Sequence, residues 1–107
     1  MGGGPSKAPE GFDQMTFDKS KQFAINVQYC GGWGYGSYAN YAKELISKAY
    51  PACTVTLARD NGTTGNMEIT HVPSGQKVHS KKGGDGQLGE NNALKMITKL
   101  KALVEGK

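Results

Sequence analysis

The pattern of hydrophobic and polar positions divides the chain after about residue 20. Residues 1–20 show no sustained hydrophobic period and are rich in Gly, Pro and Ser, a composition that predicts a flexible tail. From residue 23 to residue 29 apolar residues occupy every second position, as in a strand with one buried face. The pattern therefore predicts a tail over residues 1–20 and a folded domain over residues 21–107.

The rest of the domain alternates between helical and strand periods. Between residues 38 and 49 apolar residues recur every three to four positions, which predicts an amphipathic helix of about three turns that ends near Pro51. Strand-like alternation returns over residues 53–58, 66–72 and 76–80. The short Pro-Ser-Gly turn between the last two segments predicts a hairpin. A glycine-rich loop and a final helix from about residue 91 complete the chain.

The predicted order is therefore strand, helix, strand, strand, strand, helix. A strand–helix–strand unit forms a right-handed parallel crossover, so we expect the first two strands to be parallel. The strands alternate, whereas a parallel strand covered on both faces would be continuously apolar. The sequence predicts an α/β two-layer sandwich, with a four-stranded mixed sheet and both helices on one face.

Composition narrows the classes of function. The chain has 107 residues, the length of one domain, and a net charge of +4 in which lysines and glutamates are interspersed. Without a concentrated basic face, we do not expect nucleic-acid binding. Two cysteines cannot form a disulfide framework, which favours a reducing, cytoplasmic location. No apolar run approaches the roughly 20 residues of a membrane span.

The predicted strand directions bring several chemically interesting residues to one edge of the sheet. Cys30 ends the first strand and precedes a helix, whose backbone N–H groups and dipole favour a thiolate. Ligands of open α/β sheets bind at the carboxyl ends of parallel strands. The third and fourth strands add to the same edge Thr64, Gly65, His79, Ser80, Lys81 and Lys82. An inert cysteine beside an ordinary turn explains Cys30 equally well.

The other candidate redox or metal-binding residues, Cys53, His71 and His79, have no suitable partner residues in the sequence. Cys53 begins the second strand and so lies at the opposite edge. A strand is about 17–20 Å long, whereas disulfide-bonded Cα atoms lie about 4.4–6.8 Å apart, so Cys53 cannot resolve a disulfide at Cys30. His71 and His79 have no cysteine pair beside them. We therefore expect no metal site.

Three segments resemble the selenoprotein W family. "VQYCGGWGY" resembles that family's strand ending in Tyr-Cys-Gly-x-selenocysteine-Gly-Tyr. "TGNMEI" resembles its Thr-Gly-x-Phe-Glu-Val strand, and "KVHSKKGGDGQL" is similar to its Ile-His-Ser-Lys-Lys-x-Gly-Asp-Gly segment. The three segments occur in the family's order, and the resemblance covers about residues 23–105.

The resemblance implies a thioredoxin-like fold and a Cys-x-x-selenocysteine redox site. It matches Cys30 to the family's cysteine and Trp33 to the selenocysteine position, with Gly31 and Gly32 between them. It further implies glutathione-linked antioxidant activity with glutathione as co-substrate, no tightly bound cofactor, and redox-regulated partners such as 14-3-3 proteins. Two rim cations, Lys81 and Lys82, together with His79, would hold the anionic tripeptide. A solvated loop is the alternative explanation of the two lysines.

Trp33 departs from the family pattern, because an indole cannot attack a disulfide. Two explanations remain open. In the first, a UGA codon at position 33 is read as Trp here but encodes selenocysteine in the natural protein. In the second, Trp33 is genuine, and the chain is either a one-thiol enzyme or a redox-inactive binding module that uses the same rim for a protein partner. The sequence does not decide whether the protein is an enzyme.

The N-terminus carries a separate signal. "MGGGPSK" fits the N-myristoylation pattern M-G-x-x-x-[ST], with Gly2 as the acceptor. A chance match in a Gly/Pro-rich tail is the alternative. A single acyl chain would give only weak, reversible membrane association.

Overall fold

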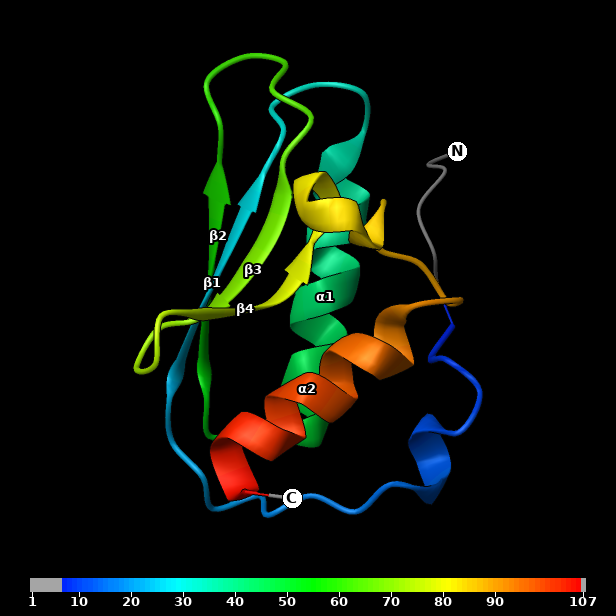
Figure 1. The fold of residues 1–107 in the computed structure, drawn as a ribbon, viewed down its shortest axis with the longest axis vertical. Helices are drawn as coiled ribbons and strands as arrows, with labels where there is room; N and C mark the ends of the chain where they lie inside the picture. Colours follow the sequence, from blue (N-terminus) through cyan, green and yellow to red (C-terminus); the bar gives the residue numbers. More distant parts are fainter. Residues whose placement is uncertain (1–6, 107) are drawn as a thin grey trace.

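The computed structural model describes residues 7–106, and Figure 1 shows their fold. Its main elements are β1 (Ala24–Tyr29), α1 (Tyr35–Ala49), β2 (Thr54–Arg59), β3 (Met67–His71), β4 (Gln76–Ser80) and α2 (Ala93–Glu105). A 3-10 turn at Phe12–Gln14 precedes β1, and a short π-type turn at Lys81–Asp85 follows β4. The order of the main elements confirms the predicted order.

The four strands form one mixed sheet in the order β2-β1-β3-β4. β1 pairs with β2 in parallel and with β3 in antiparallel orientation, and β3 and β4 form the predicted antiparallel hairpin. Both helices lie on one side of the sheet in Figure 1. The structure thus confirms a thioredoxin-like α/β fold with two layers.

The core lies between the sheet and the two helices. The alternation in β1 buries Ile25 and Val27, as the sequence pattern predicts. The helices contribute to the same buried cluster Ala39, Ala42, Leu45, Ile46, Met96, Ile97 and Leu100. Burial of these apolar side chains is the main force that holds the two layers together.

Helix α1 is longer than the sequence pattern predicts. It has 15 residues, which make about four turns, and begins at Tyr35 rather than near residue 38. Its N-cap, Gly34, has a φ of 70°, a left-handed conformation that glycine adopts at little cost. The glycine-rich loop therefore passes directly into the helix, so that the loop and the first turn of α1 form one unit.

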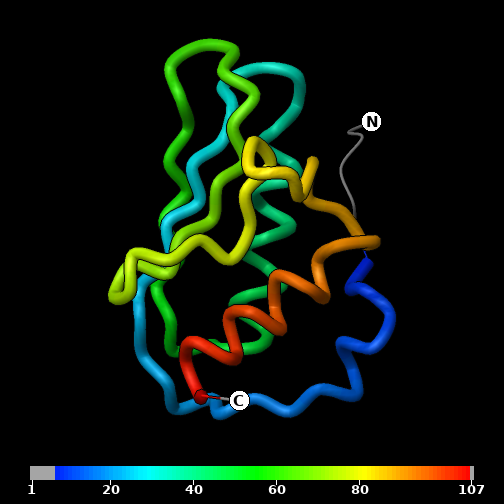
Figure 2. The backbone as a smooth tube through the Cα atoms, viewed as in Figure 1, coloured from blue at the N-terminus to red at the C-terminus, as the bar shows by residue number. Residues whose placement is uncertain are grey.

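Residues 7–20 pack against the domain, unlike the flexible tail that their composition predicts. Phe12 is buried, and the ring of Phe17 lies 5.5 Å from the ring of Phe12 and 5.3 Å from that of Tyr50. The carboxylate of Glu105, at the end of α2, accepts hydrogen bonds from the Asp18 N–H and the Tyr50 hydroxyl. Figure 2 shows this segment passing next to the C-terminal end of α2. Gly2 lies outside the described residues.

Candidate active site

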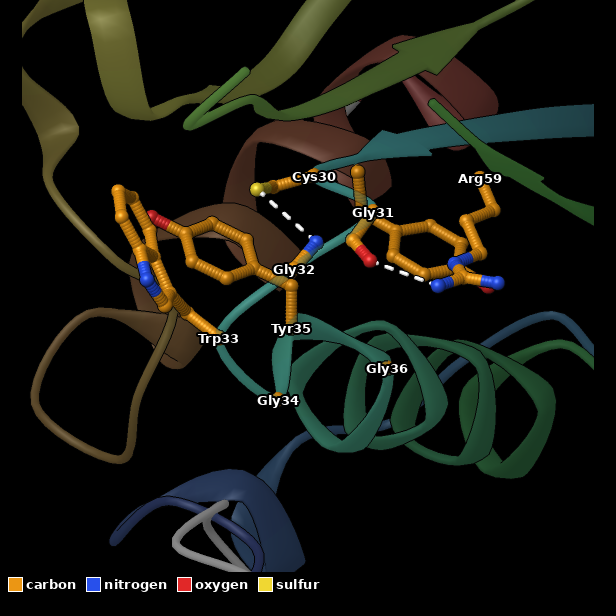
Figure 3. A pocket seen from close by; sticks show the side chains of 9 residues that line it. Cys30, Gly31, Gly32, Trp33, Gly34, Tyr35, Gly36 and Arg59 are labelled. Atoms are coloured by element: carbon orange, nitrogen blue, oxygen red, sulfur yellow. Dashed lines mark hydrogen bonds between the residues drawn. The ribbon is translucent and has the colours of Figure 1, made fainter. Parts of the chain in front are cut away.

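An open pocket of about 300 Å³ lies where β1 ends and α1 begins. Cys30 directly follows β1, and Arg59 is the last residue of β2. The parallel pairing of the two strands places Arg59 beside Tyr29. The pocket, drawn in Figure 3, is lined by Tyr29, Cys30, Gly31, Gly32, Trp33, Gly34, Tyr35, Gly36 and Arg59.

Hydrogen-bond donors surround the sulfur of Cys30, whose exposed fraction is only 1%. Its Sγ accepts a hydrogen bond from the Gly32 N–H at 3.3 Å. Burial raises the pKa of the Cys30 thiol, but the N–H groups of Gly65, Gly32 and Thr64 outweigh it and leave the pKa below its ordinary value. The site therefore favours a thiolate, the form of cysteine that acts as a nucleophile.

The two glycines after Cys30 allow the loop of residues 60–65 to approach closely. The Gly31 N–H donates to the Gly62 carbonyl at 2.9 Å. A Cβ atom on Gly31 would lie 2.3 Å from the Asp60 carbonyl oxygen, and one on Gly32 would lie 2.7 Å from Thr63 Oγ1. The backbone carbonyl leaves no room for a side chain at Gly31, whereas the exposed Thr63 side chain beside Gly32 could rotate away. The glycines thus let the loop bring the donors of Thr64 and Gly65 to the sulfur.

Arg59 contacts the same turn from the other side. Its guanidinium Nη2 donates to the Gly31 carbonyl oxygen at 2.7 Å. That carbonyl and the Gly32 N–H belong to one peptide group, so the peptide accepts from a cation at one end and donates to Cys30 Sγ at the other (Figure 3). Hydrogen bonds in such a chain polarise and strengthen one another. In the sequence, the only signal for Arg59 is its place at the end of a strand parallel to β1.

Trp33 lies at the mouth of the pocket, with 77% of its surface exposed. Its backbone has a φ of 57°, which is uncommon for a residue with a side chain. Figure 3 shows the indole projecting from the turn toward the ring of Tyr35. Position 33 and Cys30 thus line the same pocket, but an indole has no thiol chemistry.

The predicted rim residues after β4 do not line this pocket. β3 lies between β4 and β1, and neighbouring strands are about 4.8 Å apart. His79 is 2% exposed, and its Nε2 lies 2.8 Å from the Gly86 carbonyl oxygen. The side chain of His79 is thus buried against the following turn and does not line the pocket, and its role in ligand binding stays a prediction.

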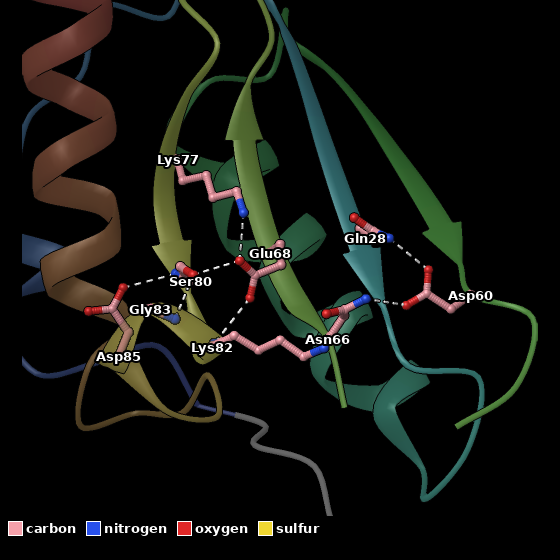
Figure 4. Close-up of polar contacts among 9 residues, drawn as sticks. All are labelled: Gln28, Asp60, Asn66, Glu68, Lys77, Ser80, Lys82, Gly83 and Asp85. Carbon is pink, nitrogen blue, oxygen red and sulfur yellow. Dashed lines mark hydrogen bonds and ion pairs between the residues drawn. The ribbon is translucent and has the colours of Figure 1, made fainter. Parts of the chain in front are cut away.

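Ser80, Lys81 and Lys82 belong to that turn rather than to the pocket. Buried Glu68 accepts hydrogen bonds from the Ser80 hydroxyl and the Lys82 N–H and forms an ion pair with Lys77 (Figure 4). Ser80 Oγ also accepts from the Gly83 N–H at 2.9 Å. These contacts fix the turn at Lys81–Asp85, which the sequence pattern predicts only as a loop. Ser80 and the backbone of Lys82 therefore hold this turn against Glu68.

The second cysteine is remote from the first. Cys53 precedes β2, whereas the pocket lies at the other end of that strand. This confirms the predicted position of Cys53 at the opposite edge of the sheet. Burial raises the pKa of the Cys53 thiol. Within residues 7–106 no group of three or more His, Cys, Asp or Glu side chains is arranged to hold a metal ion, and no helix is long and apolar enough to cross a membrane.

Comparison with known proteins assigns the family. The model of the Rdx family matches residues 24–100, which include every strand of the sheet and the whole pocket. The chain belongs to the Rdx family. Curated relatives of this Rdx-family chain include selenoprotein W of Mus musculus and of Rattus norvegicus, each 36% identical over 74% of this chain and 90% of the relative. Selenoprotein W of Danio rerio is 34% identical over 68% of this chain and 84% of the relative. No solved structure gives a significant match.

Proposed function

We propose that this Rdx-family chain is a thiol redox protein that carries out glutathione-linked thiol–disulfide exchange through Cys30. The observation that carries the proposal is the sulfur of Cys30, which lies in a pocket among N–H donors that lower its thiol pKa. A thiolate is the species that attacks disulfides. The similarity to selenoprotein W over nearly the whole domain supports the same chemistry.

The exchange consists of two displacement steps. The Cys30 thiolate attacks the glutathione sulfur of a mixed disulfide between glutathione and a substrate thiol, the new S–S bond forms, the old one breaks, and the substrate leaves as a thiolate that takes a proton from water. A second glutathione thiolate then attacks the glutathione sulfur of the mixed disulfide with Cys30 and releases the Cys30 thiolate. Over the two steps the substrate disulfide is reduced and glutathione is oxidised to glutathione disulfide, with no need for a tightly bound cofactor.

Mass spectrometry of the intact protein tests this reaction. In a Cys53→Ser background, which removes the other free thiol, glutathione disulfide should add one glutathione to Cys30, and reduced glutathione should remove it. The Cys30→Ser, Cys53→Ser protein is the control and should remain unmodified. A Cys53→Ser protein that forms no adduct under native conditions, but does so once unfolded, would contradict the proposal.

Position 33 decides whether the site has one redox residue or two. We propose that it is the selenocysteine position of the family, where a selenol would attack first and Cys30 would resolve the adduct as a selenenylsulfide. Tandem mass spectrometry of the native tryptic peptide 22–43 tests this. Alkylated selenocysteine with its isotope pattern would establish the two-residue site. Tryptophan would limit the protein to the mixed-disulfide reaction of Cys30.

One observation favours a second candidate function, a redox-inactive binding module. Cys30 is 1% exposed, whereas the indole of Trp33 beside it is 77% exposed, and exposed tryptophans are frequent anchors of protein interfaces. A 14-3-3 protein is the partner that the family resemblance suggests. Calorimetry with a purified 14-3-3 protein distinguishes the two functions. Binding that is lost in Trp33→Ala but retained in Cys30→Ser would support the module, and no binding would exclude this partner.

We also propose a cytoplasmic location with weak membrane association through a myristoyl group on Gly2. The M-G-x-x-x-[ST] pattern of the sequence supports this proposal. A Gly2→Ala change should move the protein from the membrane fraction to the soluble fraction of cells. An unchanged distribution would contradict it.

A further inference from the structure

Arg59 is the one charged residue among the described residues that line the pocket of Cys30. Glycines, aromatic residues and the thiol form the rest of its wall. The guanidinium group carries five N–H donors in a fixed plane. Within residues 7–106 its hydrogen-bonding partner is the Gly31 carbonyl oxygen. Since Arg59 is exposed, donors remain for a ligand that enters the pocket.

No acidic side chain competes for this guanidinium in the described pocket. Asp60, the next residue along the chain, is held elsewhere. Its carboxylate accepts hydrogen bonds from the side chains of Gln28, Thr64 and Asn66, as Figure 4 shows for Gln28 and Asn66. The pocket therefore contains one uncompensated cation, and an anionic group of a ligand would compensate it.

One peptide group connects Arg59 to the reacting sulfur. The Gly31–Gly32 peptide accepts from Arg59 at 2.7 Å and donates to Cys30 Sγ at 3.3 Å. A ligand whose sulfur meets Cys30 Sγ can therefore place a carboxylate at Arg59 only if a few bonds separate the two groups. Small aliphatic thiols with a terminal carboxylate have this form.

We propose that Arg59 binds the carboxylate of the substrate, so that the site selects small anionic disulfides over neutral ones. The inference rests on the proposed function of Cys30 and assigns the substrate class to that site. A thiolate that attacks an anionic disulfide meets like charge, and the guanidinium offsets this repulsion. The Sγ–S bond forms, the disulfide bond breaks, and the carboxylate-bearing leaving thiolate takes a proton from water. Arg59 changes no bond; it holds the substrate.

Two small disulfides, one anionic and one neutral, test the proposal. In the Cys53→Ser background, the rate of Cys30 modification is measured with dithiodipropionate, which is anionic, and with bis(hydroxyethyl) disulfide, which is neutral. We expect Arg59→Gln to lower the ratio of the anionic to the neutral rate by roughly fivefold, the value of one exposed ion pair. Arg59→Lys should retain part of the preference. Added salt should reduce the ratio in the Cys53→Ser protein but not in Arg59→Gln.

Lys48→Gln is the matched control, because it removes the same charge in the last turn of α1, at the far end from the pocket. It should leave the ratio unchanged. If Arg59→Gln slows both probes equally, Arg59 only supports the turn and the proposal is overturned. An unchanged ratio in both Arg59 variants, in proteins that circular dichroism shows to be folded, overturns it as well. If Cys30 reacts with neither probe, the proposed function fails and the inference fails with it.

Discussion

At the scale of single residues, the site depends on how one peptide group is held. The Gly31–Gly32 peptide connects Arg59 to the sulfur of Cys30 through two hydrogen bonds. Because the Arg59 guanidinium donates to the carbonyl oxygen of this peptide, the Gly32 N–H at its other end becomes a stronger hydrogen-bond donor. That N–H group favours the thiolate of Cys30. Arg59 thus supports the reactivity of Cys30 without contacting its sulfur.

This arrangement predicts that Arg59→Gln raises the pKa of the Cys30 thiol. The amide proton of Gly32, which donates to the sulfur, should report the change directly in NMR titrations. In the Cys53→Ser protein its resonance should shift as Cys30 ionises, and the midpoint should lie at higher pH in Arg59→Gln. Lys48→Gln should leave the midpoint in place. Equal midpoints in all three proteins would show that Arg59 does not affect the pKa of the Cys30 thiol through this peptide group.

A second residue-scale prediction concerns pH and the stability of the fold. Burial lowers the pKa of His79, and the hydrogen bond to Gly86 and the carboxylates of Asp85 and Glu68 only partly oppose it. The unfolded chain therefore binds this proton first as the pH falls below about 6.5. Stability from neutral His79 is present above that pH and is lost as the pH falls toward the folded-state pKa.

His79→Gln should accordingly flatten the fall in unfolding free energy between pH 6.5 and 5, since glutamine can donate to Gly86 but does not titrate. One proton contributes at most about 1.4 kcal/mol per pH unit. Urea unfolding at several pH values measures the slope. Burial also lowers the pKa of His71, which serves as the comparison. His71→Gln should remove a separate part of the dependence of unfolding free energy on pH. A His79→Gln slope equal to that of the parent would contradict the account.

At the scale of elements, the loop of residues 60–65 and the turn after β1 are fitted to each other. We predict that Gly31→Ala destabilises the protein by about 1–3 kcal/mol, because its Cβ would lie 2.3 Å from the Asp60 carbonyl oxygen. The same change should alter Cys30 reactivity by moving the donors of Thr64 and Gly65. Thermal unfolding and the rate of Cys30 alkylation measure the two effects.

Gly36→Ala is the matched control for this prediction. Gly36 lies in the first turn of α1, and a Cβ there would meet nothing within 4 Å. Alanine is the better helix former by about 1 kcal/mol, so this variant should be as stable as the parent or more stable. If Gly31→Ala is as stable as the parent, the loop of residues 60–65 can move away at little cost, and its close contact with Gly31 is not required for stability.

The elements also show what periodicity could and could not predict. Alternation identified the four strands, and the short turn at residues 73–75 identified the β3–β4 hairpin, because each signal is local. The direction of each strand then placed Cys30 and Thr64 at one edge. The place of β4 in the strand order could not be predicted in this way. His79 lies at the predicted end of its strand, but it is buried and β3 separates it from the pocket. Strand direction alone does not give that order.

Arg59 illustrates a different limit. It matches no block of the family resemblance, and a charged residue at a strand end is ordinary in any sequence. Its role becomes visible only when the parallel register sets it opposite Tyr29 and its guanidinium reaches Gly31. The thiol of Cys30 could be predicted from sequence, but the cation beside it could not.

At the scale of the whole molecule, the segment before β1 belongs to the folded unit. A chain of aromatic contacts links the N-terminal segment to the residue before β1. The ring of Phe12 contacts that of Phe17, Phe17 contacts Tyr50, and Tyr50 contacts Phe23. Isolated aromatic residues in a Gly/Pro-rich segment produce no hydrophobic period, so composition predicts disorder there. The match to the Rdx family begins only at residue 24 and gives no information about this segment.

We therefore predict that Phe12→Ala lowers the unfolding free energy by about 3 kcal/mol, the cost of removing a buried ring. This is a large fraction of the roughly 5–15 kcal/mol of a small domain. Urea unfolding measures it. Deletion of residues 1–20 should have at least the same effect. Full stability after deletion of residues 1–20 would instead show a dispensable tail.

The pH dependence of Cys30 alkylation in the Cys53→Ser protein decides whether Cys30 is a reactive thiol. We expect a rate that rises with pH and has a midpoint below that of the thiol in the unfolded chain, since the N–H donors of Gly65, Gly32 and Thr64 favour the thiolate over the effect of burial. Unfolding in urea should restore the ordinary midpoint. A thiol that stays unreactive in the folded protein, or titrates above the unfolded midpoint, would contradict the account and leave the binding module as the function of this fold.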